Sequence, residues 1–148
     1  MQTDDKGYVI TASISAIRKL DCDEIWQITR SDKGITGTKW VPELAPGWDL
    51  YNQYLNNWKG KPPEEWWPLY EKTFNEELKS EVKLAALRRL WSLVNSGKVI
   101  ALVCFCPDNT WCHRRLVAKF LEKHGIQTEE YTNSNTSFDE SVTQPVLF

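Results

Sequence analysis

The sequence predicts an α/β domain built on a small, mostly parallel sheet of three to four strands flanked by about four helices. Two observations carry this prediction. Segments rich in β-branched residues alternate with segments whose apolar residues recur every three or four positions. One segment, residues 98–106 (KVIALVCFC), is a nearly continuous apolar run, as in a parallel strand buried on both faces. The length of 148 residues suits a single domain, which we expect to span residues 1–132.

Two strands are expected before the first helix. Residues 7–14 (GYVITASI) are rich in β-branched residues, and residues 24–30 (EIWQITR) alternate apolar with polar positions. Residues 15–23 form a short connection between them. Residues 31–39 contain two glycines and no helical pattern, which predicts a loop, and the two prolines within residues 40–47 predict irregular structure.

Three helices are expected in the middle of the chain. Residues 48–58 carry aromatic and aliphatic side chains at helical spacing. Residues 63–79 begin with a proline and two glutamates, which favour a first helical turn, while Pro68 predicts a kink or a later start. Residues 80–96 form the third helix, which Gly97 ends. The stripe predicted to be buried on this third helix consists of Leu84, Leu87, Leu90, Trp91 and Val94.

The central strand, residues 98–106, is followed by a turn and a fourth helix. That helix is expected over residues 112–124, with Gly125 at its C-terminus. Residues 127–131 are expected to form a last short strand. Residues 133–148 are polar and rich in serine and threonine, which predicts a flexible C-terminal tail.

Charge and hydropathy restrict the possible functions. The net charge is −2, so the chain lacks the basic excess typical of proteins that grip extended duplex DNA. It contains no apolar run of bilayer length and no signal peptide, and we therefore expect a cytoplasmic protein that does not bind membranes. In that reducing compartment the four cysteines are expected to be free thiols.

Residues 104–115 are the candidate ligand site. A strand there delivers the chain to the carboxyl edge of the sheet, where ligands of open α/β sheets bind, and the following helix N-terminus favours anions. We expect a small anionic ligand, with a nucleotide as the leading candidate, because arginine matches phosphate and a tryptophan can stack on a base. The expected ligand-binding residues are Arg30, Ser13, Asn109, Thr110, Trp111 and Arg114.

A cysteine- or histidine-dependent enzyme acting on a nucleotide or a modified nucleobase is the alternative. Cys112 lies near a helix N-terminus and cationic groups, which lower the pKa of a thiol. Cys106, at the end of the predicted strand, is the alternative nucleophile. His113 would act as an acid or base. The expected catalytic residues are therefore Cys112, His113 and Cys106, whereas Cys104 is expected to be a small core residue.

Two further possibilities follow from composition. Three cysteines and a histidine within residues 104–113 are suitable zinc ligands, but they lack the paired Cys-x-x-Cys spacing of structural zinc sites, so we expect no metal and no other cofactor. Eight tryptophans could instead supply a protein-binding surface, as in a viral or bacterial adaptor. The tryptophans expected to lie in the core rather than on such a surface are Trp40, Trp48, Trp58, Trp66 and Trp67.

Several of these segments together are similar to a known family. Residues 43–54 (ELAPGWDLYNQY), Tyr70 in the next helix, and residues 99–121 (VIALVCFCPDNTWCHRRLVAKFL) resemble the domain of unknown function 488 family. The resemblance covers most of residues 8–125. It implies a compact intracellular α/β protein of bacteria or their viruses, from a family with no general activity assigned, although some members carry a DNA-repair label.

The resemblance also assigns motif positions. The family's Cys-His-Arg motif corresponds to Cys112, His113 and Arg114, and its strand-end arginine corresponds to Arg30. Relatives often carry an acidic residue where this chain has Cys106, so the resemblance does not imply a catalytic role for that cysteine.

Overall fold

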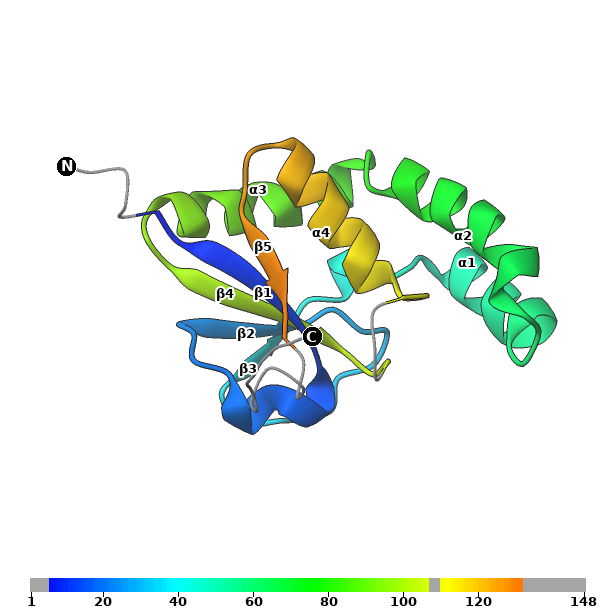
Figure 1. Cartoon of the computed structure of the whole chain (residues 1–148), viewed down its shortest axis with the longest axis horizontal. Helices are drawn as coiled ribbons and strands as arrows, with labels where there is room; N and C mark the ends of the chain where they lie inside the picture. The colour runs from blue at the N-terminus through cyan, green and yellow to red at the C-terminus, as the bar shows by residue number, and fades with distance from the viewer. Residues whose placement is uncertain (1–5, 107–109, 132–148) are drawn as a thin grey trace, which may run out of the picture.

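The computed structural model describes residues 6–106 and 110–131, and its centre is a five-stranded sheet in the order β3-β2-β4-β1-β5 (Figure 1). Each neighbouring pair of strands is parallel, which confirms the predicted α/β class. The predicted tail, residues 133–148, lies outside the described residues. The strands are β1 (Tyr8–Ser13), β2 (Glu24–Gln27), β3 (Thr38–Trp40), β4 (Val99–Cys104) and β5 (Thr128–Glu130).

The strand β3 is the one that the sequence did not predict. It is only three residues long, and Lys39 and Trp40 are exposed, so it shows no alternation of apolar and polar positions. Its parallel pairing with β2, rather than a pattern in its own sequence, holds these three residues in a strand. The Gln27 side chain in β2 reinforces that pairing by donating a hydrogen bond of 2.7 Å to Thr38 Oγ1.

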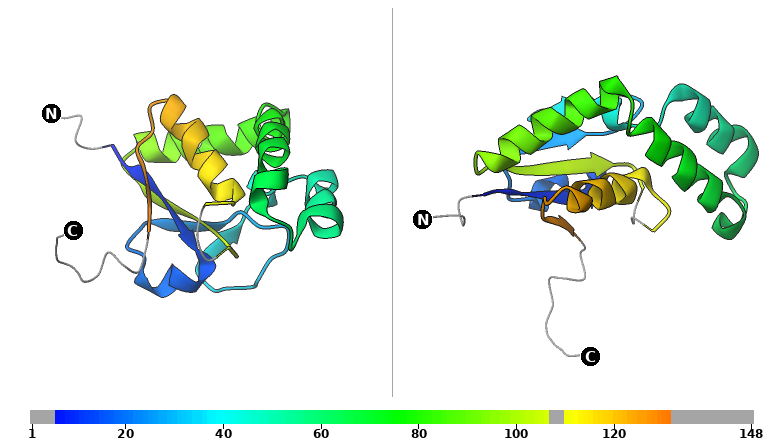
Figure 2. Two further views of the ribbon diagram at one scale, coloured as in Figure 1. Left: turned by 45° about the vertical axis from the view of Figure 1, so that its right-hand side comes forward. Right: turned by 90° about the horizontal axis from the view of Figure 1, so that it is seen from above.

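Two helices cover one face of the sheet, and a short 3₁₀ helix covers the other (Figures 1 and 2). The pair on the first face is α3 and α4, and the 3₁₀ helix is η2. The helices α1 and α2 lie beyond the carboxyl end of β4 (Figure 1). None of the described helices is long and apolar enough to cross a membrane. The helices are η2 (Ile14–Lys19), η3 (Pro42–Leu44), α1 (Trp48–Gln53), the π-helical η4 (Tyr54–Trp58), α2 (Pro63–Glu77), α3 (Glu81–Asn95) and α4 (His113–Lys123).

The main core lies between the sheet and the pair α3 and α4. Trp26 and Leu102 from the sheet pack there with Leu90 and Leu116 from the helices, and all four are fully or almost fully buried. The predicted stripe on α3 is wrong at one position: Trp91 is 50% exposed. The helix α2 starts at the first predicted position and continues through Pro68.

Gly7 lies where β1 passes close to the turn between α3 and β4. Its N–H donates to the Val94 carbonyl at 2.8 Å, and a Cβ added to it would lie 1.7 Å from the Lys98 carbonyl oxygen. We expect Gly7→Ala to lower the free energy of unfolding by about 1–3 kcal/mol, as overpacking does, when measured by urea denaturation. Lys6→Ala is the control, because Lys6 is exposed. Equal urea midpoints of unfolding for Gly7→Ala and Lys6→Ala would contradict the close approach of Gly7 to the Lys98 carbonyl.

Candidate functional site

A cleft with about 710 Å³ of space, counted out to the solvent, opens at the carboxyl edge of the sheet. Residues after β2, the end of β4, the start of α4 and the α1–α2 region line it. One wall is aromatic, and the thiols of the β4–α4 segment lie in the same cleft. The aromatic side chains lining the cleft are Tyr51, Tyr54, Trp66, Tyr70, Phe105 and Trp111.

Ring contacts hold the aromatic wall in place. Trp66 stacks on Trp58 with centroids 5.9 Å apart, and Tyr70 stacks on Trp67 at 5.3 Å. Trp111 meets Trp67 edge to face at 5.7 Å. Offset stacking and edge-to-face contacts are the favoured geometries of aromatic pairs. The wall is therefore a fixed apolar surface rather than a set of independent side chains.

Arg30 reaches this cleft from the segment that follows β2. Its Nη2 donates to the Pro42 carbonyl at 2.8 Å, and its guanidinium carbon lies 4.9 Å from the Trp48 ring centroid. Its Nε is buried and has no hydrogen-bond partner among the described residues. Such an unpaired buried donor is costly, and it marks a position that an acceptor on a ligand would satisfy.

His113 is held in one tautomer by the backbone. Its Nε2 lies 2.7 Å from the Ile28 carbonyl oxygen, which can only accept, so Nε2 carries the hydrogen. Nδ1 then presents a lone pair, 3.8 Å from Cys112 Sγ. Burial lowers the pKa of His113, which keeps the ring neutral at pH 7.

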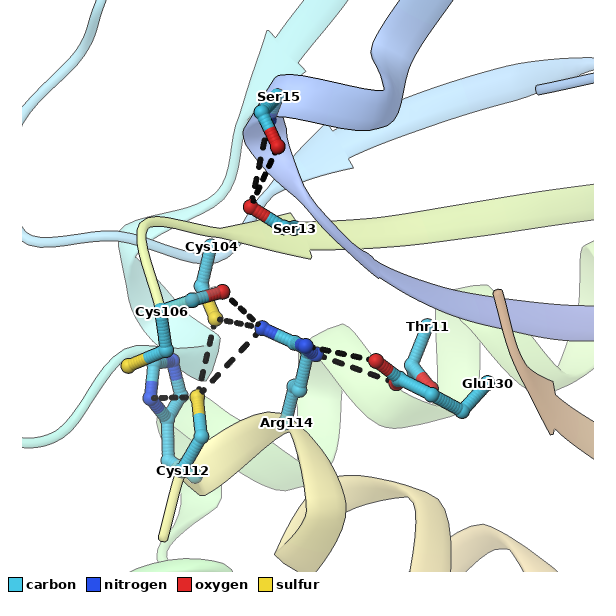
Figure 3. A network of polar contacts seen from close by, with 9 residues as sticks. Thr11, Ser13, Ser15, Cys104, Cys106, Cys112, Arg114 and Glu130 are labelled. Atoms are coloured by element: carbon cyan, nitrogen blue, oxygen red, sulfur yellow. Dashed lines mark hydrogen bonds and ion pairs between the residues drawn. The ribbon is translucent and has the colours of Figure 1, made fainter. Parts of the chain in front are cut away.

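Three thiols gather between β4 and α4 (Figure 3). Cys104 is the last residue of β4, Cys112 is the N-cap of α4, and their Sγ atoms are 3.0 Å apart. With Cys106, all three Sγ atoms lie within 4.8 Å of one another. We call these three residues the thiol cluster.

The charge on the thiol cluster differs from the sequence prediction. Hydrogen bonds from Cys106 and Cys112 stabilise the thiolate of Cys104 and hold its pKa well below the usual value. Their hydrogen bonds to Cys104 raise the pKa of Cys106 to about 11 and the pKa of Cys112 well above its usual value. The direction of these pKa shifts, together with the Arg114 guanidinium 3.1 Å from Cys104 Sγ, favours the thiolate at Cys104 rather than at Cys112, where the sequence predicted it.

Arg114 does not contact the cleft. Its side chain is 0% exposed, and its Nε and Nη2 pair with the Glu130 carboxylate at 3.2 and 2.6 Å. Its Nη1 donates to Cys104 Sγ at 3.1 Å and to the Cys106 carbonyl at 2.8 Å (Figure 3). All three guanidinium nitrogens have protein partners, so the structure places Arg114 behind the cleft, and its predicted role in binding the ligand stays a prediction. Its contacts instead position the thiol cluster.

The other predicted ligand residues divide between the cleft and its surroundings. Trp111 lines the cleft, but Ser13, the last residue of β1, does not: its Oγ lies 3.1 Å from the hydroxyl of Ser15 in η2 (Figure 3). Thr110 is exposed and its carbonyl accepts from Arg115. Asn109 lies outside the described residues.

Apart from Trp111, the sequence did not identify the aromatic wall as part of the site. Trp66 was expected in the core, and it is buried there while also lining the cleft. Helical spacing of Tyr51, Tyr54, Trp66 and Tyr70 was the available signal, but it does not distinguish a core face from a cleft face. Of the other tryptophans expected in the core, Trp67 is buried, whereas Trp40 and Trp48 are exposed.

This arrangement has two chemical capabilities. The aromatic wall and Arg30 can hold a planar ligand with a negative group. The thiol cluster with His113 Nδ1 offers soft donors that can act as nucleophiles or bind a thiophilic metal.

Comparison with known proteins supports the family resemblance. No curated protein and no solved structure matched the chain. A family model described as the active DUF488-N3 subclade matches residues 9–125, which is most of the chain and includes nearly all of β1, the residues that line the cleft and the Cys-His-Arg motif. The chain therefore belongs to the domain of unknown function 488 family, in its N3a group.

Proposed function

We propose that the cleft binds a small planar ligand carrying an anionic group, of the nucleotide class. The observation that carries this proposal is the aromatic wall facing Arg30, whose buried Nε has no hydrogen-bond partner among the described residues. The cleft opens at the carboxyl edge of the parallel sheet, which is where open α/β sheets bind their ligands.

The two sides of the cleft would recognise different parts of the ligand. A base would stack on the faces of Trp66, Tyr54 or Trp111, since every base has a π-face and such stacking tolerates different bases. A phosphate would accept from Arg30, and the N-terminus of α4 would add its favourable dipole. A nucleoside without phosphate would keep only the first of these contributions.

A thermal-shift screen of the full chain tests the proposal. We expect at least one nucleoside mono- or diphosphate to raise the melting temperature, because a ligand that binds only the folded state stabilises it. Arg30→Gln should weaken that ligand by about 10- to 100-fold, the usual contribution of a charged hydrogen bond. Arg88→Gln, on the exposed side of α3, is the matched control and should leave the shift unchanged.

Two outcomes would overturn the proposal. One is that no nucleotide shifts the melting temperature of the wild-type chain. The other is that Arg30→Gln responds to every nucleotide as Arg88→Gln does, which would place binding outside this cleft.

Turnover of the ligand by Cys112, His113 or Cys106 stays a prediction, as does the adaptor function. The family description as active concerns the subclade and is consistent with turnover.

A further inference from the structure

The thiol cluster is built from two segments that are separate in sequence. Cys104 is the last residue of β4, Cys106 follows it two residues later, and Cys112 caps α4. Spacing had argued against zinc because the chain lacks a Cys-x-x-Cys pair. The fold removes that objection, since the three Sγ atoms lie within 4.8 Å of one another without such a pair.

We propose that Cys104, Cys106, Cys112 and His113 bind a thiophilic divalent metal ion of the zinc class. In a tetrahedral zinc site the Zn–S bond is about 2.3 Å, which separates neighbouring sulfurs by about 3.8 Å and sulfur from nitrogen by about 3.6 Å. Cys104 Sγ and Cys112 Sγ are 3.0 Å apart, and Cys112 Sγ is 3.8 Å from His113 Nδ1. Shifts of less than about 1 Å bring each of these two pairs to the spacing of a metal's ligands. His113 Nδ1 is not among the ligand atoms that all lie within 4.8 Å of one another, so it has to approach the other sulfurs more closely when a metal binds.

The surroundings of His113 match those of a metal-binding histidine. Its Nε2–H donates to the Ile28 carbonyl at 2.7 Å, which leaves Nδ1 as the free nitrogen on the side of Cys112. Histidine ligands commonly donate their second ring N–H to a backbone carbonyl, because this fixes the tautomer and the ring orientation.

Arg114 completes the second layer of contacts around the cluster. Three thiolates and one divalent cation leave one net negative charge, which the guanidinium beside Cys104 offsets. Its donation to the Cys106 carbonyl fixes the backbone that carries the third thiol. Cys106 is half-buried and lines the cleft, so the metal can enter and leave from that side.

Cobalt(II) titration of the chelator-treated full chain, under anaerobic and reducing conditions, tests this proposal. We expect one equivalent of Co²⁺ to bind with the intense near-ultraviolet bands of thiolate coordination, and one equivalent of Zn²⁺ to remove them. Cys106→Ser should weaken Co²⁺ binding by more than about 100-fold, since loss of a second-layer contact alone costs about 10- to 100-fold. His113→Gln should shift the visible bands as well as weaken binding.

Cys22→Ser is the matched control, and it should bind Co²⁺ like the wild type. Cys22 lies next to Asp23, which contacts Val99 at the start of β4, at the opposite end of that strand from Cys104. If Cys104→Ser fails to fold, the half-buried Cys106 still provides a testable variant. Absence of thiolate bands in the wild type, or unchanged bands in Cys106→Ser, would overturn the proposal.

The metal proposal and the nucleotide proposal can be contradicted separately. Arg30→Gln, which tests nucleotide binding, should keep full Co²⁺ binding because Arg30 is outside the thiol cluster. Rapid alkylation of Cys104 by iodoacetamide that one equivalent of Zn²⁺ does not slow would also overturn the metal proposal, and would favour a nucleophilic thiol.

Discussion

Arg114→Met is expected to lower the free energy of unfolding by about 3–5 kcal/mol, because removing one member of a buried ion pair leaves the other without compensation. The guanidinium is fully buried, and Glu130 is only 18% exposed. Without Arg114, the Glu130 carboxylate keeps Thr11 Oγ1 as a donor, at 2.6 Å, and the thiolate of Cys104 loses its adjacent cation. Urea denaturation followed by tryptophan fluorescence measures the change.

Two further variants separate the ion pair from the general effect of losing an arginine. Arg115→Met, one position along α4, removes a partly exposed arginine that donates a hydrogen bond to the Thr110 carbonyl, and we expect a change below about 0.5 kcal/mol. Adding Glu130→Gln to Arg114→Met should recover part of the loss, because the unpaired carboxylate is gone. Equal stability of Arg114→Met and Arg115→Met would contradict a buried pair.

Phe74→Ala is expected to cost about 3–5 kcal/mol, the range for deleting a buried aromatic ring. Phe74 is completely buried, stacks on Tyr70 with centroids 6.4 Å apart, and meets His113 edge to face at 5.7 Å. Its loss should therefore also loosen one side of the cleft. Thermal denaturation gives the stability, and the nucleotide-induced shift in melting temperature gives the effect on the cleft.

Leu69→Ala is the control on the same helix, because Leu69 is 54% exposed. We expect its stability to change by less than about 0.5 kcal/mol, with no change in ligand response. If Phe74→Ala keeps the wild-type ligand response at a temperature where it is folded, the aromatic wall does not depend on this packing.

The sequence could predict the location of the site because of topology. Arg30 follows β2 and the Cys-His-Arg motif follows β4, and these parallel strands are neighbours. Their carboxyl ends must therefore meet at one edge. The alternation of residues 24–30 and the apolar run of residues 98–106 were enough to predict both strands.

The sequence could not predict the partners of each motif residue. Successive helix positions point in different directions, and Arg114 turns toward Glu130, which lies in a three-residue strand at the edge of the sheet. Cys104 was correctly predicted to be buried, but its charge depends on Cys106, Cys112 and Arg114, whose contacts only the fold defines. Patterns of hydrophobicity report burial and do not report which polar atoms meet.

The most direct test of the proposed function is a titration cycle that removes the ligand's phosphate and the Arg30 side chain separately and together. Isothermal titration would measure a nucleoside and its monophosphate against the wild-type chain and Arg30→Gln. We expect the wild type to bind the monophosphate about 10- to 100-fold more tightly than the nucleoside, with one site, and Arg30→Gln to lose that preference. A preference that survives in Arg30→Gln, or no binding of either ligand to the wild type, would contradict the proposal.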